Sequence, residues 1–193
     1  MNHFSITARR IAAIAAGVAA TGLIVTTAAF ATTSSGGART SAASVPACTA
    51  FGLGVWVAVG QGNGAAGTIF YPLEFTNLSG HTCSLFGFPG VSAINMHGNQ
   101  LGSPANWEGT TSPHRVILAP GATAHTMLAY HDAAVTTEAG CDPVNSAALL
   151  KVYPPGQHNW TYAAYDFQSC SRPGVRYLSI VGPIIPGVGT ING

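Results

Sequence analysis

The sequence predicts an all-β protein with a β-sandwich of about eight or nine strands. Several short segments alternate apolar and polar residues at the period of two that a half-buried strand shows. Turn-forming residues recur between these segments, with 24 glycines and 12 prolines in 193 residues. No segment shows a sustained helical period, so an antiparallel sandwich is favoured over a helical fold.

The strand expected at residues 69–76 illustrates the pattern. Apolar side chains at alternate positions from Ile69 to Phe75 share one face. Glu74 falls on the opposite face, which we expect to be exposed. Pro72 cannot donate a ladder hydrogen bond, which favours an edge strand or a bulge there. The full set of expected strands is 53–59, 69–76, 81–86, 91–96, 115–119, 124–130, 149–153, 160–167 and 176–181.

Residues 69–98 are expected to form a three-stranded meander. Asn77 and Gly80 supply the first turn, because Asn can bond its own backbone and Gly tolerates positive φ. Phe88-Pro89-Gly90 supplies the second turn. The glycine-rich segment 60–67 precedes β-branched and aromatic residues rather than a helix, so it is interpreted as a hairpin connection and not as a phosphate site.

The first 31 residues have the pattern of a secretory signal peptide. Arg9 and Arg10 precede a long apolar run, and Ala29-Phe30-Ala31 fits a cleavage site. We therefore expect a secreted or extracytoplasmic protein, and association with the cell wall is one alternative. The run is also near the length of a membrane span, so a retained anchor is the alternative.

The domain boundaries follow from composition. Residues 32–45 contain mostly Ser, Thr, Gly and Ala and are expected to be a disordered linker. The sandwich is expected at 46–183. Residues 184–193, which are rich in Pro and Gly, are expected to form a flexible tail.

Charge excludes two classes of partner. Only 7% of the residues are Asp, Glu, Lys or Arg, and the formal net charge is +1. The sequence has no basic stripe, so it lacks the electrostatic footprint of a nucleic-acid-binding protein. It has no polybasic segment to bind an anionic membrane surface, and no membrane span is expected after signal cleavage.

Four cysteines, Cys48, Cys83, Cys141 and Cys170, form an even set in a chain expected to be exported. They allow three connectivities, and sequence alone does not choose among them. Cys48–Cys83 and Cys141–Cys170 are favoured, since each would tie neighbouring β segments. The spacing does not match a zinc site, because no Cys-x-x-Cys or paired-His motif occurs.

Catalytic motifs are missing from the sequence. Neither Gly-x-Ser-x-Gly nor His-Glu-x-x-His occurs, so serine-hydrolase and metalloprotease chemistry lack support. A secreted hydrolase with a carboxylate pair is kept as an alternative. The acidic residues available for such a pair are Glu74, Glu108, Asp132, Glu138, Asp142 and Asp166.

Copper binding is a second alternative. His125 and Met127 are two residues apart on one expected strand and share a face. Met96 and His97 end another expected strand. Thioether and imidazole ligands together suit Cu(I). These four residues are the candidate metal ligands, although no fixed spacing supports them.

Aromatic residues are the other candidate feature. One sandwich core is not expected to hold all of five large aromatic side chains, which are Trp56, Phe70, Trp107, Trp160 and Tyr162. If several gathered on one face, they would mark a binding patch for a glycan or a protein.

Several motifs along the expected sandwich resemble those of a known family. The run from Phe75 to Val91 resembles the hallmark of the secreted and lipid-anchored proteins described as domain of unknown function 4232, found mainly in high-GC Gram-positive bacteria. Residues 118–124, Cys141-Asp142-Pro143 and 152–155 resemble the family's later motifs in the same order. The resemblance covers about Cys48 to Gly182. It implies an extracytoplasmic, Ig-like β-sandwich with two disulfides, and it carries no catalytic residues. The chain lacks a convincing lipobox.

The sequence therefore favours a secreted or cell-envelope binding or structural module without catalysis. Its partner would be an envelope glycan or protein of unknown identity. We expect a monomer with no cofactor.

Overall fold

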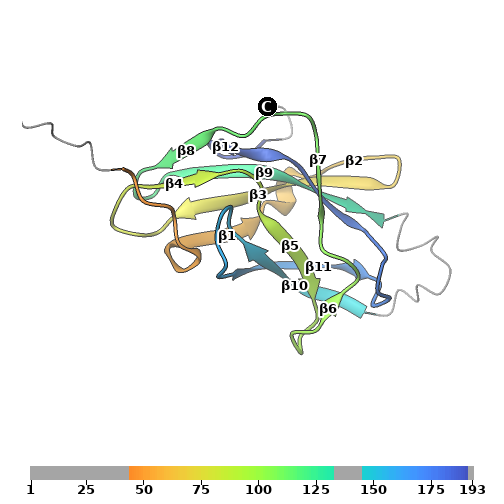
Figure 1. Ribbon diagram of the computed structural model, residues 1–193. Helices are drawn as coiled ribbons and strands as arrows, with labels where there is room; N and C mark the ends of the chain where they lie inside the picture. Colours follow the sequence, from red (N-terminus) through yellow and green to blue (C-terminus); the bar gives the residue numbers. More distant parts are fainter. Residues whose placement is uncertain (1–43, 133–144, 191–193) are drawn as a thin grey trace, which may run out of the picture. The chain divides into compact units, whose positions relative to one another are not determined.

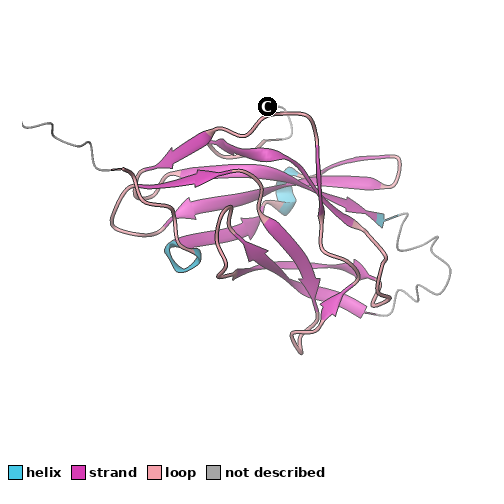
Figure 2. Ribbon diagram, viewed as in Figure 1, coloured by secondary structure: helices cyan, strands magenta, loops and turns pink. Residues whose placement is uncertain are grey.

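The structure is a computed structural model, and it describes residues 44–132 and 145–190. Figure 1 colours the described chain along its sequence, and Figure 2 shows that strands dominate it. The predicted all-β class is confirmed. Two single 3-10 turns, η1 (Ala50–Gly52) and η2 (Val59–Gln61), flank the first strand. The predicted signal peptide (1–31) and most of the predicted linker (32–45) lie outside the described residues.

A six-stranded sheet and a four-stranded sheet form the sandwich (Figure 1), and a two-stranded sheet contacts the last strand. The six-stranded sheet contains β1 (Leu53–Val57), β2 (Asn63–Ala65), β3 (Thr68–Asn77), β7 (Asn106–Glu108), β9 (Thr123–His131) and β12 (Leu178–Pro186). The four-stranded sheet contains β5 (Gly90–Ile94), β6 (Gln100–Leu101), β10 (Asn145–Tyr153) and β11 (Thr161–Ser169). The remaining pair is β4 (Cys83–Phe86) with β8 (Arg115–Leu118).

The strand order places β3, β9 and β12 in the interior of the larger sheet. The order is β1–β3–β9–β12–β7, with β2 also paired to β3. The smaller sheet has the order β11–β10–β5–β6. No helix in the described ranges, 44–132 and 145–190, is long and apolar enough to span a membrane.

Alternate residues of both sheets form the core. The alternation predicted for residues 124–130 is confirmed, because Ala124, Thr126, Leu128 and Tyr130 are all buried. Burial of such apolar area stabilises the fold by about 25 cal/mol per Å². Other core side chains are Leu73, Phe75, Val91, Leu118, Leu150, Val152, Tyr177, Ile180 and Ile184.

The predicted meander at 69–98 is wrong. Its three strands exist, but β3, β4 and β5 belong to three different sheets. The chain leaves the β4–β8 pair at Gly87, which has a φ of +107° and accepts a hydrogen bond from Ile184 N–H at 3.0 Å. A period-two pattern identifies strands, but it does not identify their partners, which here come from β8, β9 and β10.

The prediction of an edge strand at Pro72 is also wrong, since β3 pairs with β9 along one side and with β1 and β2 along the other. Pro72 lies where the β1 partner has ended and the β2 partner has not begun. Its carbonyl accepts a bond from Ala58 N–H at 2.9 Å on that side. The N–H and C=O of one strand residue point to the same side, so the missing donor of Pro72 falls in this gap.

The described end of the chain belongs to the sandwich, which corrects the predicted tail at 184–193. β12 continues to Pro186, Ile184 is buried, and Gly187 N–H donates to the Thr123 carbonyl at 2.9 Å. Gly182, with a φ of +84°, lies inside a register shift, so the Pro and Gly residues bulge the strand rather than end it.

The segment at 101–114, where no strand was expected, contains the short strand β7. This strand is parallel to β12, with Ser179 opposite Asn106, so the sandwich is not purely antiparallel. Two parallel strands cannot be joined by a tight hairpin. Turn-forming residues near β7 therefore do not reveal its pairing with β12.

The Cys48–Cys83 disulfide is present. It joins the first described segment to β4, where Cys48 N–H donates to Ser84 O at 2.9 Å and Ser84 N–H donates to Pro46 O at 2.8 Å. Pro46 is therefore part of the folded domain. Cys141 lies outside the described residues, so the favoured Cys141–Cys170 bond stays a prediction.

Asn77 forms the predicted turn and also ties it to β8. Its side-chain oxygen accepts from Ser79 N–H at 3.0 Å and from the Ser79 hydroxyl at 2.6 Å. Its side-chain nitrogen donates to His81 O and to Leu118 O, each at 2.9 Å. Asn77 is fully buried, and these four bonds use the full capacity of its amide.

Candidate functional site

Four side chains of the β10–β11 hairpin form an aromatic platform, which we define as Lys151, Tyr153, Trp160 and Tyr162. Trp160 and Tyr162 are exposed, and Lys151 and Tyr153 are half-buried. The period of two places Lys151 and Tyr153 on one face of β10, while Val152 between them is fully buried. Tyr162 lies directly opposite Lys151 on β11. The platform thus stands on the outer face of the four-stranded sheet.

Trp160 contacts Tyr162, and the lysine contacts Trp160 and Tyr153. The centroids of Trp160 and Tyr162 are 6.0 Å apart at an interplanar angle of 57°. Lys151 Nζ lies 4.7 Å from the Trp160 centroid and 5.4 Å from the Tyr153 centroid. Each exposed cation–π contact contributes about 0.5–1 kcal/mol, which orients the rings while leaving them accessible. Trp160 and Tyr162 are 37% and 50% exposed.

Small residues and a tight turn keep the platform uncovered. On the neighbouring strand β5, Gly90 is opposite Tyr153 and Ser92 is opposite Lys151, so no bulky side chain rises beside them. The connection to β11 turns at Gly156, which has a φ of +71°, and Gln157 N–H donates to Pro154 O at 3.0 Å. This turn returns the chain so that Trp160 lies beside Lys151.

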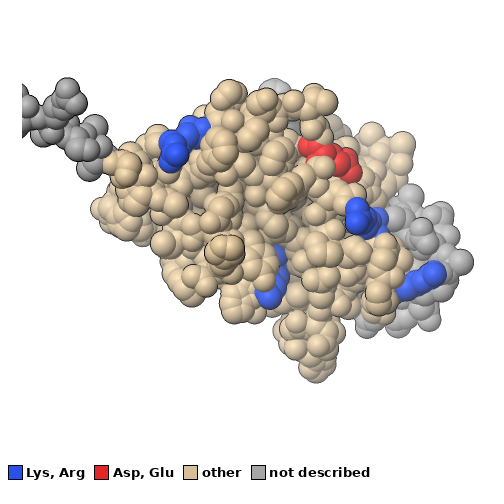
Figure 3. All heavy atoms as spheres, viewed as in Figure 1, with Lys and Arg blue, Asp and Glu red and all other residues tan. Residues whose placement is uncertain are grey.

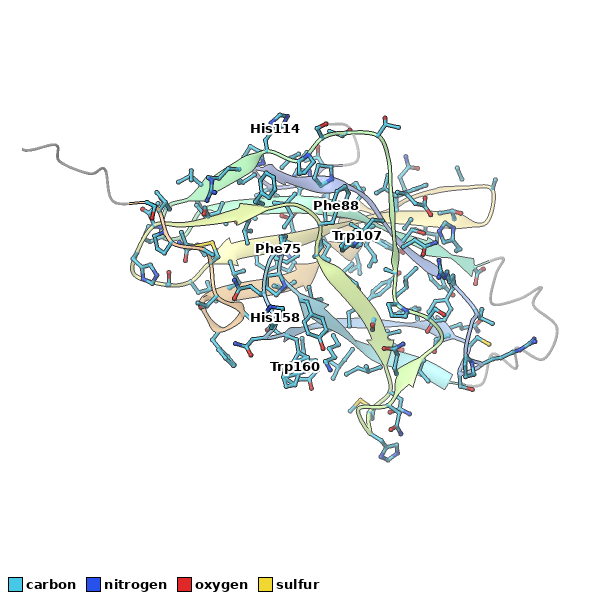
Figure 4. The ribbon with its side chains drawn as sticks, viewed as in Figure 1. Phe75, Phe88, Trp107, His114, His158 and Trp160 are labelled. Carbon is cyan, nitrogen blue, oxygen red and sulfur yellow. A yellow bond between two sulfur atoms is a disulfide. The ribbon has the colours of Figure 1, made fainter. Side chains whose placement is uncertain are left out.

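Of the five aromatic residues singled out in the sequence, Trp160 and Tyr162 gather in one place. Trp56 belongs to β1 of the other sheet. Trp107 stacks on Phe88 with centroids 5.5 Å apart and donates to Pro89 O at 2.9 Å. Figure 4 shows Trp107 beside Phe88 and well apart from Trp160.

Lys151 and Tyr153 were missed as site residues, although the sequence contains a signal for them. The pattern Lys-x-Tyr followed by Trp-x-Tyr, on two expected strands joined by Pro-Pro-Gly, places all four side chains on one face of a hairpin. The sequence alone does not show that these two strands pair. Only their pairing in the sheet brings the Lys-x-Tyr and Trp-x-Tyr side chains together.

The four copper candidates do not converge. Met96 and His97 follow β5 of the smaller sheet, and Met96 is largely exposed, whereas His125 and Met127 belong to β9 of the larger sheet. His125 and Met127 do line one shared pocket of about 180 Å³. His125 Nδ1–H donates to Gly187 O at 2.8 Å, so one ring nitrogen is already engaged. Among the described residues, no group of three His, Cys, Asp or Glu is arranged to hold a metal ion.

Positively charged side chains are sparse on one face of the molecule (Figure 3). Figure 3 shows that the Lys and Arg residues on the face drawn lie apart from one another. The described residues therefore form no basic patch on this face.

Hydrogen-bonded polar side chains link β9, β12 and β7 of the larger sheet at Ser179. The Ser179 hydroxyl donates to Glu108 Oε1 at 2.6 Å, and His131 Nε2 lies 2.9 Å from Ser179 Oγ. The single hydroxyl proton points to Glu108, so His131 Nε2–H donates to Ser179 and cannot take its proton. Ser179 is also only 2% exposed. The arrangement ties strands together and lacks the polarity of an activated nucleophile.

Glu74 is the buried carboxyl of the larger sheet, which corrects its predicted exposure. Its Oε1 accepts from Gly189 N–H at 2.8 Å, while Oε2 is buried without a partner. Burial raises the pKa of Glu74, and the Gly189 bond and the charge of His125 oppose that rise only in part. Gly189 packs so closely that a Cβ there would lie 2.6 Å from Pro72 Cβ.

We expect Glu74→Gln to stabilise the protein at neutral pH. A native pKa above the ordinary value means that the folded state holds its proton to higher pH than the unfolded chain. The unfolding free energy therefore falls as pH rises from the ordinary carboxyl pKa through the native one. Glutamine does not ionise, so the variant should not lose unfolding free energy in this way. We expect the gain at neutral pH to be about 1–3 kcal/mol, which is the cost of burying a polar group without a partner.

Chemical denaturation of both proteins at pH 4 and pH 7 measures this difference. The gain from Glu74→Gln should be present at pH 7 and small at pH 4. Asp166→Asn, which removes an exposed carboxylate of β11, serves as the control and should show no such pH-dependent gain. A loss of stability in Glu74→Gln that is equal at both pH values would contradict the prediction.

The comparisons with known proteins identify a family. The model of the family described as "Domain of unknown function (DUF4232)" matches residues 48–179, which include the disulfide, the platform and most of both sheets. Comparisons with curated proteins and with solved structures found no match. The matched residues make up more than half of the chain, so the protein belongs to the DUF4232 family.

Proposed function

We propose that this protein is an exported, non-catalytic module of the cell envelope that binds a glycan through the aromatic platform. The observation that carries the proposal is the exposed pair Trp160 and Tyr162 on the outer sheet face, with Lys151 against the Trp160 ring. Aromatic ring faces stack on the apolar C–H face of a pyranose, and exposed aromatic groups on a soluble domain mark binding sites. The signal-peptide pattern and the disulfide support export.

A glycan suits this platform better than a protein partner. A stable protein interface buries about 800 Å² on each side and has an apolar centre. The platform consists of four side chains, and the next outward-facing residues on β11 beyond Tyr162 are Ala164, Asp166 and Gln168. A small stacking surface with polar surroundings favours a repeating polymer, in which many weak contacts add up.

A sedimentation assay tests the proposal. The oxidised protein is mixed with insoluble envelope fragments from the cells that produce it, and the pelleted fraction is measured against protein concentration. We expect saturable binding that is weakened roughly tenfold or more by the double change Trp160→Ala and Tyr162→Ala, because two central aromatic contacts are lost. Trp107→Ala is the matched control and should bind as the wild type does.

Two treatments of the fragments identify the kind of partner. Periodate, which destroys sugar diols, should abolish sedimentation, while protease treatment should leave it unchanged. Loss of binding after protease alone would overturn the glycan assignment. Equal binding by the wild type and the double variant would overturn the assignment of the platform.

A further inference from the structure

A single positive charge lies at the centre of the platform. The Lys151 ammonium contacts the rings of Trp160 and Tyr153, and among the described residues it pairs with no carboxylate. Its strand neighbours are also uncharged, since Lys151 lies between Ser92 on β5 and Tyr162 on β11. The cation is therefore available to a ligand that stacks on the rings.

The contacts of Lys151 leave its hydrogen bonds available. A ring face attracts the ammonium through its quadrupole, but it does not replace an oxygen acceptor. A lysine ammonium has several N–H donors, and its hydrogen bond to an anionic oxygen is stronger than a bond to a neutral one. An anionic group on the ligand would thus gain more at this position than a hydroxyl group would.

The nearest acidic residue on the same face of β11 does not cancel this charge. Asp166 lies four residues beyond Tyr162, which corresponds to roughly 13 Å along a strand. That separation exceeds the screening length of about 8 Å at physiological ionic strength. Within the described part of the chain the platform is therefore locally cationic, although the chain as a whole is nearly neutral.

We propose that the platform recognises an acidic polysaccharide, in which a pyranose ring lies against the aromatic side chains and a ring-borne carboxylate accepts a hydrogen bond from Lys151. This inference rests on the proposed function and adds the chemical class of the ligand. A polyol phosphate has the charge without the ring, and a neutral glycan has the ring without the charge. The combination of Lys151 with Trp160 and Tyr162 selects a polymer that has both.

Binding to polygalacturonate and to its fully methyl-esterified form tests the proposal. The two polymers share the pyranose backbone and differ in whether the carboxylate is charged. Each is immobilised, and the dissociation constant of the protein is measured by interferometry. We expect tighter binding to polygalacturonate, with a preference of roughly tenfold that reflects one charge-assisted hydrogen bond at an exposed site.

Variants separate the role of the charge from that of the rings. Lys151→Gln should remove the preference while retaining binding to the ester, and Lys151→Arg should keep most of it. Trp160→Ala should weaken binding to both polymers. Raising the salt concentration should reduce the preference in the wild type and leave Lys151→Gln unchanged.

The outcomes distinguish this inference from the proposed function. Equal affinity for both polymers that is still lost in Trp160→Ala would overturn the acidic ligand and leave the glycan-binding module standing. Binding to poly(glycerol phosphate) but to neither pectin polymer would overturn the acidic pyranose. Binding to none of these polymers would also overturn it, and the envelope sedimentation assay would then decide the proposed function separately.

Discussion

Replacing Cys48 and Cys83 by alanine is expected to lower the unfolding free energy by about 4 kcal/mol. The bond spans a sequence separation of 35 residues, and the chain-entropy model assigns a cost of that size to opening such a loop in the unfolded state. For a domain of this length the melting temperature should fall by roughly 8–16 °C. Calorimetry of the wild type and the double variant measures the change directly.

The control for this experiment tests the backbone contacts that accompany the disulfide. Ser84→Ala removes the hydroxyl that donates to Pro46 O at 3.3 Å and accepts from Arg115 at 2.9 Å. It leaves in place the disulfide and the two backbone bonds that join Pro46 and Cys48 to Ser84. Its effect should be about 1 kcal/mol. If the double cysteine variant melted within a degree or two of the wild type, the backbone bonds would be holding the first segment, and the role given to the disulfide would be wrong.

Asn77→Ala is expected to cost about 2–5 kcal/mol of unfolding free energy. The change removes four side-chain hydrogen bonds and leaves the carbonyls of His81 and Leu118 without their amide donor. A buried acceptor left without a partner costs about 1–3 kcal/mol. The β3–β4 turn should also lose its connection to β8, so the amide protons of β4 should exchange faster with solvent.

Ser79→Ala is the matched control for Asn77. It removes the hydroxyl that bonds Asn77 Oδ1 and His81 O but leaves the link from Asn77 to Leu118 intact. We expect a loss of about 1 kcal/mol or less, because Ser79 is only half-buried and solvent can reach the groups that its hydroxyl leaves. Equal destabilisation by both changes would show that the turn matters and that the link to β8 does not.

Local patterns were sufficient to predict the longer strands and the Asn77 turn, but they missed the short strands β2, β6 and β7. The buried alternation of β9 follows from side chains two residues apart, and the Asn77 turn follows from a bond within two residues. Both features depend on short sequence separations. The pairings of β3 with β9, of β4 with β8 and of β5 with β10 join segments that lie far apart along the chain. These pairings are specified by the packing of the whole domain.

Glu74 shows why burial can escape a periodic pattern. Its side chain lies on the outer face of β3, as the alternation predicts, but Gly189 covers it from 115 residues away. The platform is an intermediate case. The sequence contained its residues and predicted both strands, and only the pairing of Lys151 with Tyr162 brings the four side chains together.

Hydroxyl-radical footprinting tests most directly whether the platform is the binding surface. The protein is oxidised briefly with and without polysaccharide extracted from the envelope of its own cells, and the modification of each aromatic residue is measured by mass spectrometry. Trp160 and Tyr162 should be protected by the polysaccharide, while Trp107, which is 63% exposed on the other sheet, should be modified equally in both samples. Protection of Trp107 with no change at Trp160 and Tyr162 would contradict the assignment of the binding face.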